Sequence, residues 1–167
     1  TGVVTTLAGS SSGSTDATGT SASFNGPLGI TTDGTNLYVV NYISHRIRKI
    51  VIDNGTVTTL AGSSSGSTDA TGTSASFNGP RGITTDGTNL YVADYSNNRI
   101  RKIVIDNGTV TTLAGSSSGF ADATGTSASF NGPWGITTDG TNLYVSDTEN
   151  HRIRKIVIST GVVTTLA

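Results

Sequence analysis

The sequence predicts an all-β protein built from β-propeller blades, and three observations support this. The chain repeats itself, because the TTLA context of one leucine recurs every 53 residues, which indicates stacked supersecondary units. Thr, Val, Ile and Tyr gather in short runs, which favours strands, and no segment has a helical period. Asp-Gly and Asn-Gly dipeptides between the runs indicate tight hairpins. The repeated leucines are Leu7, Leu60, Leu113 and Leu166.

The chain is expected to begin with one outer strand and a polar connector. Residues 1–8 (TGVVTTLA) are identical to residues 160–167, which end the last unit, so both are predicted to be outer strands. Residues 9–27 are too rich in Gly and Ser to be regular structure. Their one large apolar side chain, Phe24, recurs as Phe77 and Phe130, and we expect these rings to anchor the connectors between neighbouring units.

Four short strands, a to d, are predicted after each connector. In the first unit they cover 29–33, 37–40, 46–52 and 56–62. The turns at 33–36 and 53–55 tolerate positive φ, and a loop at 41–45 joins the second strand to the third. A lone antiparallel meander cannot bury both of its faces. Packing such sheets face to face around an axis buries them, and that arrangement is a β-propeller.

The repeat predicts three complete blades, at 29–62, 82–115 and 135–167. We divide the chain into an outer strand of a preceding blade (1–8) and three connector-plus-blade units (9–62, 63–115 and 116–167). Propellers have roughly four to eight blades, so three do not close a ring. We expect half of a six-bladed ring, completed by self-association, or a window of a longer array. Without Met, the chain is expected to be processed, engineered or part of something longer.

Composition narrows the function classes. The formal net charge of −1 gives no overall attraction to nucleic acid or anionic membranes. No apolar run approaches the roughly 20 residues that cross a bilayer, so membrane insertion is not expected. The chain has no Cys, so disulfides cannot be used to infer whether it works in an oxidising or a reducing compartment. The Ser-, Thr- and Asn-rich repeats are typical of exported microbial proteins, and we predict an extracellular or cell-surface location.

The third unit resembles the NHL repeat along most of its length. The matching motifs are GITTD at 135–139, NLYVSD at 142–147 and NHRI at 150–153. The middle unit has Asn98 in place of the family's His, and the first has Asn41 in place of Asp and Ser44 in place of Asn. The TLAG strand and the GITTDGTNLYV motif are similar to bacterial NHL proteins of a long-repeat type. The resemblance implies a β-propeller, usually of six blades.

The differences between the units gather on one predicted face. In a propeller the d–a and b–c loops emerge on the same side, and these loops vary here while the opposite turns hardly change. A constant scaffold with one variable rim is typical of a binding surface, although drift in tolerant loops would look similar. The residues predicted for this face are Leu28, Arg81, Trp134, Asn41, Tyr42, His45, Asp94, Tyr95, Asn98, Asp147, Glu149 and His151.

Candidate catalytic and metal-binding residues are few. His45 and His151 occupy equivalent loop positions and are interpreted as structural, because a ligating site needs several convergent ligands. Asp16, Asp69 and Asp122 could bind Ca²⁺ with loop carbonyls, but no acidic residue lies beside them and a loop-capping Asx turn is favoured. Asp33, Asp86 and Asp139 are expected to be structural turn residues. We therefore expect no cofactor and no metal.

The RIRK run supplies most of the basic residues. Some NHL proteins bind RNA through a basic face, but here the run lies along the third strand of each blade, and we expect its long stems to cover apolar surface and hold neighbouring blades together. No Ser/His/Asp or Cys/His pattern and no phosphate-binding loop is present, and the clustered ligands of lyase- or hydrolase-like NHL propellers are missing. We expect neither nucleic-acid binding nor enzymatic activity.

Two functions remain open at this point. The first is a non-catalytic NHL β-propeller module that binds protein or glycan through the variable face. The alternative is a structural repeat unit of an extracellular fibre, surface layer or oligomeric propeller assembly, which the near-identity of the units favours. A β-solenoid with an ice-binding Thr face ranks third, because its Thr pairs would recur on every short coil rather than every 53 residues.

Overall fold

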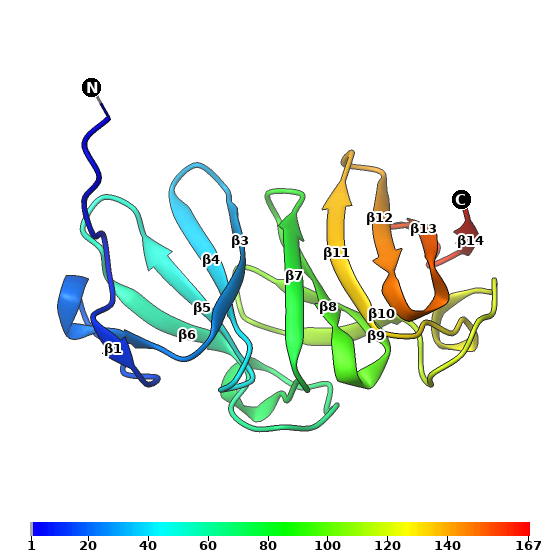
Figure 1. Cartoon of the computed structure of the whole chain (residues 1–167), viewed down its shortest axis with the longest axis horizontal. Helices are drawn as coiled ribbons and strands as arrows, with labels where there is room; N and C mark the ends of the chain where they lie inside the picture. The colour runs from blue at the N-terminus through cyan, green and yellow to red at the C-terminus, as the bar shows by residue number, and fades with distance from the viewer. Residues whose placement is uncertain (1) are drawn as a thin grey trace.

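The computed structural model describes residues 2–167 and confirms the predicted blades. Three four-stranded antiparallel sheets stand in a row, each with its strands in chain order (Figure 1). We call them blade 1, blade 2 and blade 3. Blade 1 holds β3 (Pro27–Thr32), β4 (Asn36–Asn41), β5 (Arg46–Val51) and β6 (Val57–Ala61). Blade 2 holds β7 (Pro80–Thr85), β8 (Asn89–Asp94), β9 (Arg99–Val104) and β10 (Val110–Ala114). Blade 3 holds β11 (Pro133–Thr138), β12 (Asn142–Asp147), β13 (Arg152–Val157) and β14 (Val163–Thr165).

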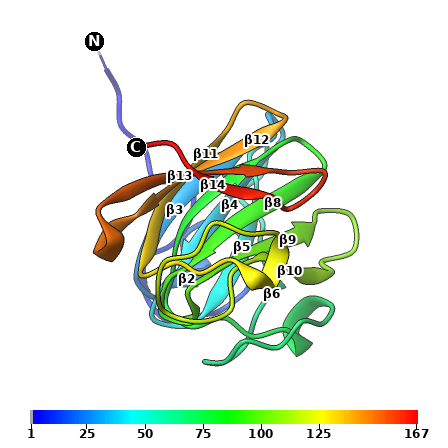
Figure 2. The ribbon, with the colours of Figure 1, turned by 90° about the vertical axis from the view of Figure 1, so that its right-hand side faces the viewer.

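The blades form an open arc. The first strands β3, β7 and β11 are neighbours along the inner side, and the two ends of the chain lie at opposite ends of the row (Figure 1). Figure 2 looks along the row and shows the sheets stacked one behind another. No helix within residues 2–167 is long and apolar enough to cross a membrane.

The apolar core lies between blades rather than within one. Side chains of blades 1 and 2 share one buried cluster, and those of blades 2 and 3 share a second. Phe77 and Phe130 are fully buried in these clusters, which confirms that the connector rings anchor neighbouring units. Phe24 is only partly buried, because no blade precedes blade 1 among the described residues.

The connectors are more regular than their composition suggests. Ser11–Ser12 (β1) pairs in parallel with Ser23–Phe24 (β2), and single 3₁₀ turns form at η1 (Gly19–Ser21), η2 (Gly72–Ser74) and η4 (Gly125–Ser127). Two further 3₁₀ turns lie in b–c loops, η3 (Tyr95–Asn97) and η5 (Thr148–Asn150). The expectation of wholly irregular connectors was therefore wrong in detail, because backbone groups of each connector pair with the outer strand of its blade, as Val57 N–H does with the Ala17 carbonyl at 2.8 Å.

The predicted outer strand at 1–8 does not form. Thr1 lies outside the described residues, and Gly2–Ala8 form no strand there, because residues 2–167 contain no strand c of a preceding blade for them to pair with. The segment nevertheless ends where an outer strand should. The Leu7 carbonyl lies 2.8 Å from a Cβ built on Gly55, as the Leu60 carbonyl does from one built on Gly108. Gly2–Ala8 therefore ends at the position that the repeat predicts for an outer strand, although it lacks the hydrogen bonds of one.

The a–b turns are held by an aspartate, as predicted. Asp33 Oδ1 accepts hydrogen bonds from the Thr35 and Asn36 backbone N–H groups at 2.8 and 2.7 Å, and Tyr38 Oη donates to Asp33 Oδ2 at 2.8 Å. Burial acts to raise the pKa of Asp33, but these hydrogen bonds outweigh it and hold the pKa well below its usual range. Asp86 and Asp139 repeat the arrangement, and the pKa of each is lowered in the same way.

These turns predict a loss of stability in acid. A carboxyl whose pKa is lower in the folded chain contributes stability above the unfolded pKa of about 3.8, and this contribution is lost as the pH falls further, through the folded pKa. We expect Asp86→Asn to flatten the dependence of the free energy of unfolding on pH below about 4. Denaturant titrations across this range measure the slope. Asp53→Asn is the control, because no hydrogen bond to the Asp53 carboxylate is found among residues 2–167, and an equal flattening there would contradict the account.

Candidate binding face

Three aromatic rings from three blades surround one arginine. Arg81, at the start of β7, has its guanidinium carbon 4.4 Å from the ring centre of Tyr42 in blade 1, 4.6 Å from that of Tyr95 in blade 2 and 3.9 Å from that of Trp134 in blade 3. Tyr95 and Trp134 meet edge to face at 5.7 Å. Each cation–π contact of this kind contributes roughly 0.5–2 kcal/mol. We call these four residues the Arg81 cluster.

The backbone explains why these positions meet. The pairing of strands a and b is irregular between Pro80 and Ile83, so that Arg81 lies in a β-bulge, and bulges redirect side chains. Trp134 lies in the same bulge of blade 3. Tyr42 and Tyr95 lie in the b–c loops, on the side opposite the a–b turns (Figure 1). The predicted grouping of d–a and b–c loop residues is thus present in the structure.

The b–c loops also bind the following blade. His45, Asn98 and His151 all have φ near +55°, which ends the loop in a left-handed residue. The Gly79 N–H donates to His45 Nδ1 at 3.1 Å, and the Gly132 N–H donates to Asn98 Oδ1 at 3.0 Å. His45 and Asn98 therefore connect blades. His151 occupies the equivalent place on blade 3 and is exposed.

Three residues predicted for the face are buried instead. Asn41, Asp94 and Asp147 have no exposed surface, so the prediction that they line a binding surface does not fit their positions. Asp94 Oδ2 accepts from Arg101 Nη1 at 2.8 Å, and its Oδ1 accepts from the Asn78 N–H at 2.7 Å. Asp94 and Asp147 lie beneath the loops because each ends strand b and pairs with a buried arginine of strand c, Arg101 or Arg154, away from solvent.

Blade 1 lacks this ion pair. Asn41 replaces the aspartate and Ser44 replaces the asparagine that binds it in blade 2, where Asn97 Nδ2 donates to Asp94 Oδ2 at 2.8 Å. Both polar atoms of the Asn41 side chain and the Ser44 hydroxyl are buried without a hydrogen-bond partner among the described residues. Buried polar groups in this state cost about 1–3 kcal/mol each. Among the three blades, blade 1 consequently leaves the most buried side-chain polar atoms without a hydrogen-bond partner.

The remaining predicted face residues stay accessible. Leu28 and Trp134 are 48 % and 45 % exposed, Glu149 and His151 are exposed, and Arg81, Tyr42, Tyr95, His45 and Asn98 are half-buried. Tyr95 Oη donates to Glu149 Oε1 at 3.3 Å, so the face carries a carboxylate beside the cluster. Leu28 has the register of Arg81 and Trp134, but blade 1 is the first blade, and Leu28 is absent from the cluster.

The sequence predicted that the RIRK run lies within each blade, but it did not predict that one arginine of each run is fully buried. Arg48, Arg101 and Arg154 are fully buried, and each lies over a connector ring, as Arg101 does over Phe77 at 5.1 Å. Burial lowers the pKa of Arg48, although the neighbouring Asp16 acts to raise it. These arginines hold each blade to its own connector rather than to the next blade, which corrects the prediction. The alternation RIRKI places both arginines on the same strand face as a buried isoleucine, but it does not show which arginine is buried.

The aspartates considered for Ca²⁺ bind these arginines. Asp16 Oδ1 accepts from Arg48 Nη2 at 2.6 Å, and Asp16 Oδ2 accepts from the Thr59 N–H at 2.9 Å. Asp69 and Asp122 repeat both contacts. The favoured Asx turn is therefore wrong here, because the carboxylate reaches across to strand d instead of its own backbone. In the described part of the chain, no three His, Cys, Asp or Glu side chains are grouped to hold a metal ion.

One exposed aromatic residue was not predicted for the face. Phe120, in the third connector, is 49 % exposed and lies 4.0 Å from the Arg152 guanidinium carbon. It has no aromatic counterpart in the other units, which have Ser14 and Ser67. The sequence placed this difference in the d–a connector, on the predicted variable face, but did not single out Phe120 as a binding residue.

Comparison with known proteins agrees with these features. The NHL repeat model matches residues 77–103 and 130–156. A curated relative, NHL repeat-containing protein 2 of Homo sapiens, is 32 % identical over 144 residues, which are 78 % of this chain but only 20 % of that protein. The chain therefore spans a small part of that relative's length.

Two solved structures share the architecture. One is an auxiliary nutrient binding protein from Bacteroides thetaiotaomicron, with a TM-score of 0.68 and 26 % identity over 83 % of this chain and 37 % of that one. The other belongs to a nidogen/laminin complex, with a TM-score of 0.62 and 20 % identity over 84 % of this chain and 48 % of that one. At 20 % identity the second likeness concerns the fold alone.

Proposed function

This chain belongs to the NHL-repeat family, and we propose that it is a non-catalytic interaction module that binds a protein or glycan ligand through the face formed by its d–a and b–c loops. One observation carries the proposal. The Arg81 cluster gathers an arginine and three aromatic rings on this face, and Trp134, the ring closest to the guanidinium, is nearly half exposed. Arg, Trp and Tyr are the residues most enriched among those that dominate binding energy at interfaces.

The cluster is pre-organised for binding. Arg81 Nε is buried without a hydrogen-bond partner in the described chain, and the rings hold the guanidinium in place. A ligand therefore meets side chains that are already ordered and loses less conformational entropy on binding. The auxiliary nutrient binding protein among the structural neighbours, at 26 % identity, is compatible with ligand binding on this fold.

Trp134→Ala is expected to weaken ligand binding by about thirtyfold, the loss of roughly 2 kcal/mol that is typical of such residues. A ligand is first selected from a displayed random-peptide library and a glycan array, and its dissociation constant is then measured by calorimetry. Ile52→Ala is the matched control, because Ile52 is 38 % exposed but its backbone N–H donates to Thr35 of the a–b turn, on the side opposite the proposed face, and the substitution should change affinity by less than about twofold. Equal losses in the two variants would contradict the proposal.

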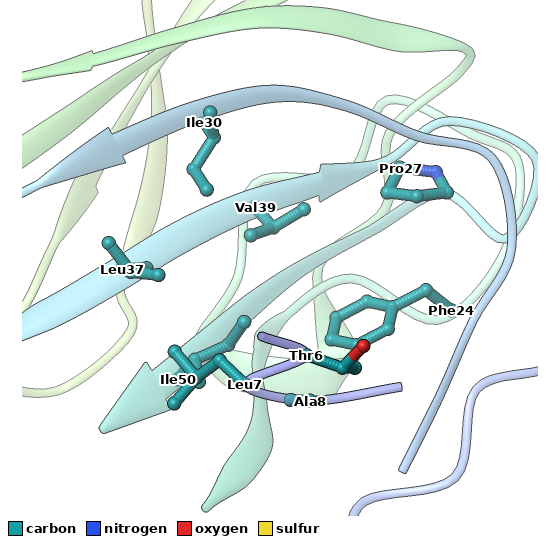
Figure 3. Close-up of a pocket in the computed structure, with 9 residues that line it drawn as sticks. All are labelled: Thr6, Leu7, Ala8, Phe24, Pro27, Ile30, Leu37, Val39 and Ile50. Carbon is teal, nitrogen blue, oxygen red and sulfur yellow. The ribbon is translucent and has the colours of Figure 1, made fainter. Parts of the chain in front are cut away.

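A structural role in an assembly is the second candidate, favoured by the near-identity of the three units. One apolar groove on blade 1 is lined by Leu7, Phe24, Ile30, Leu37, Val39 and Ile50, with Thr6, Ala8 and Pro27 at its margin (Figure 3). Another lies on blade 3 around Ile136, Tyr144 and Ile153. A fibre, surface layer or ring would cover both faces, and apolar patches of this kind mark interaction sites.

We further propose that the module needs no cofactor and acts outside the cell or at its surface. His45 Nδ1 already accepts a backbone hydrogen bond, and the carboxylates of Asp16, Asp69 and Asp122 are bound to arginines, so a cation would have to compete with a guanidinium at each. The exported location follows from composition alone. Nucleic acid is not the proposed ligand, because the second arginine of each RIRK run (Arg48, Arg101 and Arg154) is fully buried and the net charge of the chain is −1.

A further inference from the structure

We propose that the Arg81 cluster recognises a carboxylate, and that its ligand is an acidic peptide segment whose Asp or Glu side chain binds the Arg81 guanidinium. The inference rests on the proposed binding function and adds the chemistry of the ligand. Arg81 lies at the start of β7, the first strand of the middle blade, and β7 lies between β3 and β11 of the neighbouring blades (Figure 1). The site is therefore enclosed by blades on both sides.

Arg81 carries a charge that no carboxylate in residues 2–167 neutralises. Its side chain makes no hydrogen bond and no ion pair there; Nε is buried without a partner, and the two terminal nitrogens, which also lack one, remain in contact with solvent. Arg101 of the same blade is the opposite case. Its terminal nitrogens donate to the carboxylates of Asp69 and Asp94 and to two backbone carbonyls. The terminal nitrogens of Arg81 are thus available to a ligand.

The three rings around Arg81 favour an anionic ligand over a cationic one. Faces of Tyr and Trp attract cations, and rings grouped in this way would suit an ammonium group of a ligand. Arg81 itself occupies that place, between the rings of Tyr42, Tyr95 and Trp134. A second cation would be repelled by the guanidinium. A carboxylate pairs with it instead, because the planar guanidinium can donate to both carboxylate oxygens at once.

The surroundings of Arg81 also strengthen such a pair. The side chain is half-buried, and the three rings replace much of the water around its guanidinium. Opposite charges attract more strongly where water is partly excluded. The rings also restrict the guanidinium, so that less side-chain entropy is lost when a carboxylate binds. A fully exposed arginine has neither advantage, and its ion pairs contribute little.

The other polar groups around Arg81 favour a peptide over an acidic glycan. His45 Nδ1 and Asn98 Oδ1 accept backbone N–H groups, and Tyr95 Oη donates to Glu149. These groups are engaged within the chain, whereas a sugar presents hydroxyl groups on all sides and needs many hydrogen-bond partners. Aromatic rings beside one available guanidinium suit an acidic side chain that has apolar neighbours in its own peptide.

One carboxylate of this chain lies beside the site and predicts the sign of a test. Glu149 Oε1 accepts from Tyr95 Oη at 3.3 Å, and the Tyr95 ring contacts Arg81. Glu149 is exposed and forms no ion pair within residues 2–167, so it repels a ligand carboxylate weakly. Glu149→Gln should therefore tighten the binding of an acidic peptide, by up to about fivefold. Gln retains an oxygen that can accept from Tyr95, so the loop is unchanged.

Calorimetry with matched probes tests the proposal on the full chain. The probes are an array of short blocked peptides with one central Glu among apolar neighbours, the same peptides with Gln there, and oligogalacturonate as the acidic glycan. The best Glu peptides should bind roughly tenfold more tightly than their Gln partners, and Arg81→Gln should abolish this preference. Arg152→Gln is the matched control, because Arg152 also lies over an aromatic ring, Phe120, but outside the cluster. It removes the same charge and should keep the preference.

The outcomes separate this inference from the proposed function. Peptides that bind equally well with Glu and Gln would overturn the carboxylate assignment and leave the interaction module in place. A preference that survives in Arg81→Gln, or acidic binding that Glu149→Gln weakens, would overturn it as well, and the second result does not depend on how Arg81→Gln folds. Tighter binding of oligogalacturonate than of every peptide would overturn the assignment to a peptide. A chain that binds none of these probes and no member of the random-peptide library or glycan array would contradict both proposals.

Discussion

Gly82→Ala is expected to reduce the free energy of unfolding by about 1–3 kcal/mol or more, the usual effect of overpacking a close contact. The added methyl group would overlap the Trp134 carbonyl and crowd Ile136 in the next blade. A carbonyl in a sheet cannot move aside as the end of a side chain can, so the two blades must separate slightly. Chemical denaturation followed by the fluorescence of the single Trp measures the change.

Gly135→Ala is the matched control for this prediction. It makes the same substitution at the same place in blade 3, which has no blade after it among residues 2–167, and Ser146 Oγ is the nearest atom there. It should change stability by less than about 0.5 kcal/mol. Equal effects of the two substitutions would show that contact between blades is not what requires glycine.

Arg101→Met is expected to cost about 3–5 kcal/mol of stability, the typical result of leaving one partner of a buried ion pair unpaired. Arg101 and Asp94 are both fully buried and lie 2.8 Å apart. Burial already raises the pKa of Asp94, and removing the arginine raises it further. A group whose pKa is raised by folding favours the folded chain at low pH, so the variant should approach the wild type as the pH falls toward 3.8.

Arg48→Met provides the comparison within the same chain. Blade 1 has Asn41 where blade 2 has Asp94, and the one carboxylate that remains near Arg48 is that of Asp16, which is 44 % exposed. Its loss should therefore cost less than the loss of Arg101, and no recovery in acid is expected from the Asn41 position. Thermal and urea unfolding of both variants between about pH 4 and 7, the range over which a carboxyl with a raised pKa titrates, make the comparison. A larger cost at Arg48 would contradict this account of the buried charges.

The blades could be predicted from the sequence because the turn residues determine each hairpin locally and because the same unit is repeated three times. Asp-Gly and Asn-Gly turns set each hairpin, and one correct unit predicts the other two. The failures concern interactions that span the fold. Gly2–Ala8 has the sequence of an outer strand, but a strand forms only where a second strand is available for hydrogen bonding. The position of Asp94 and Asp147 differs between units, as the b–c loop positions do, which suggested an exposed site. Both side chains are buried instead, because they pair with Arg101 and Arg154 of the next strand.

The Arg81 cluster was predicted only in part. The shared register of Arg81 and Trp134, and the loop positions of Tyr42 and Tyr95, placed all four on one face. The three rings meet at one guanidinium because of the bulge in strand a and the rotation between blades. Neither feature can be predicted from the sequence.

The most direct test of the proposed binding face is the NMR signal of the Trp134 indole N–H in the presence of a selected ligand. The chain has one Trp, so this signal is unique, and Trp134 is the ring closest to Arg81 in the cluster. The account predicts that ligand binding shifts this resonance and leaves the Gly34, Gly87 and Gly140 amides of the opposite turns unchanged. A ligand that shifts those three amides and leaves the indole signal in place would contradict it.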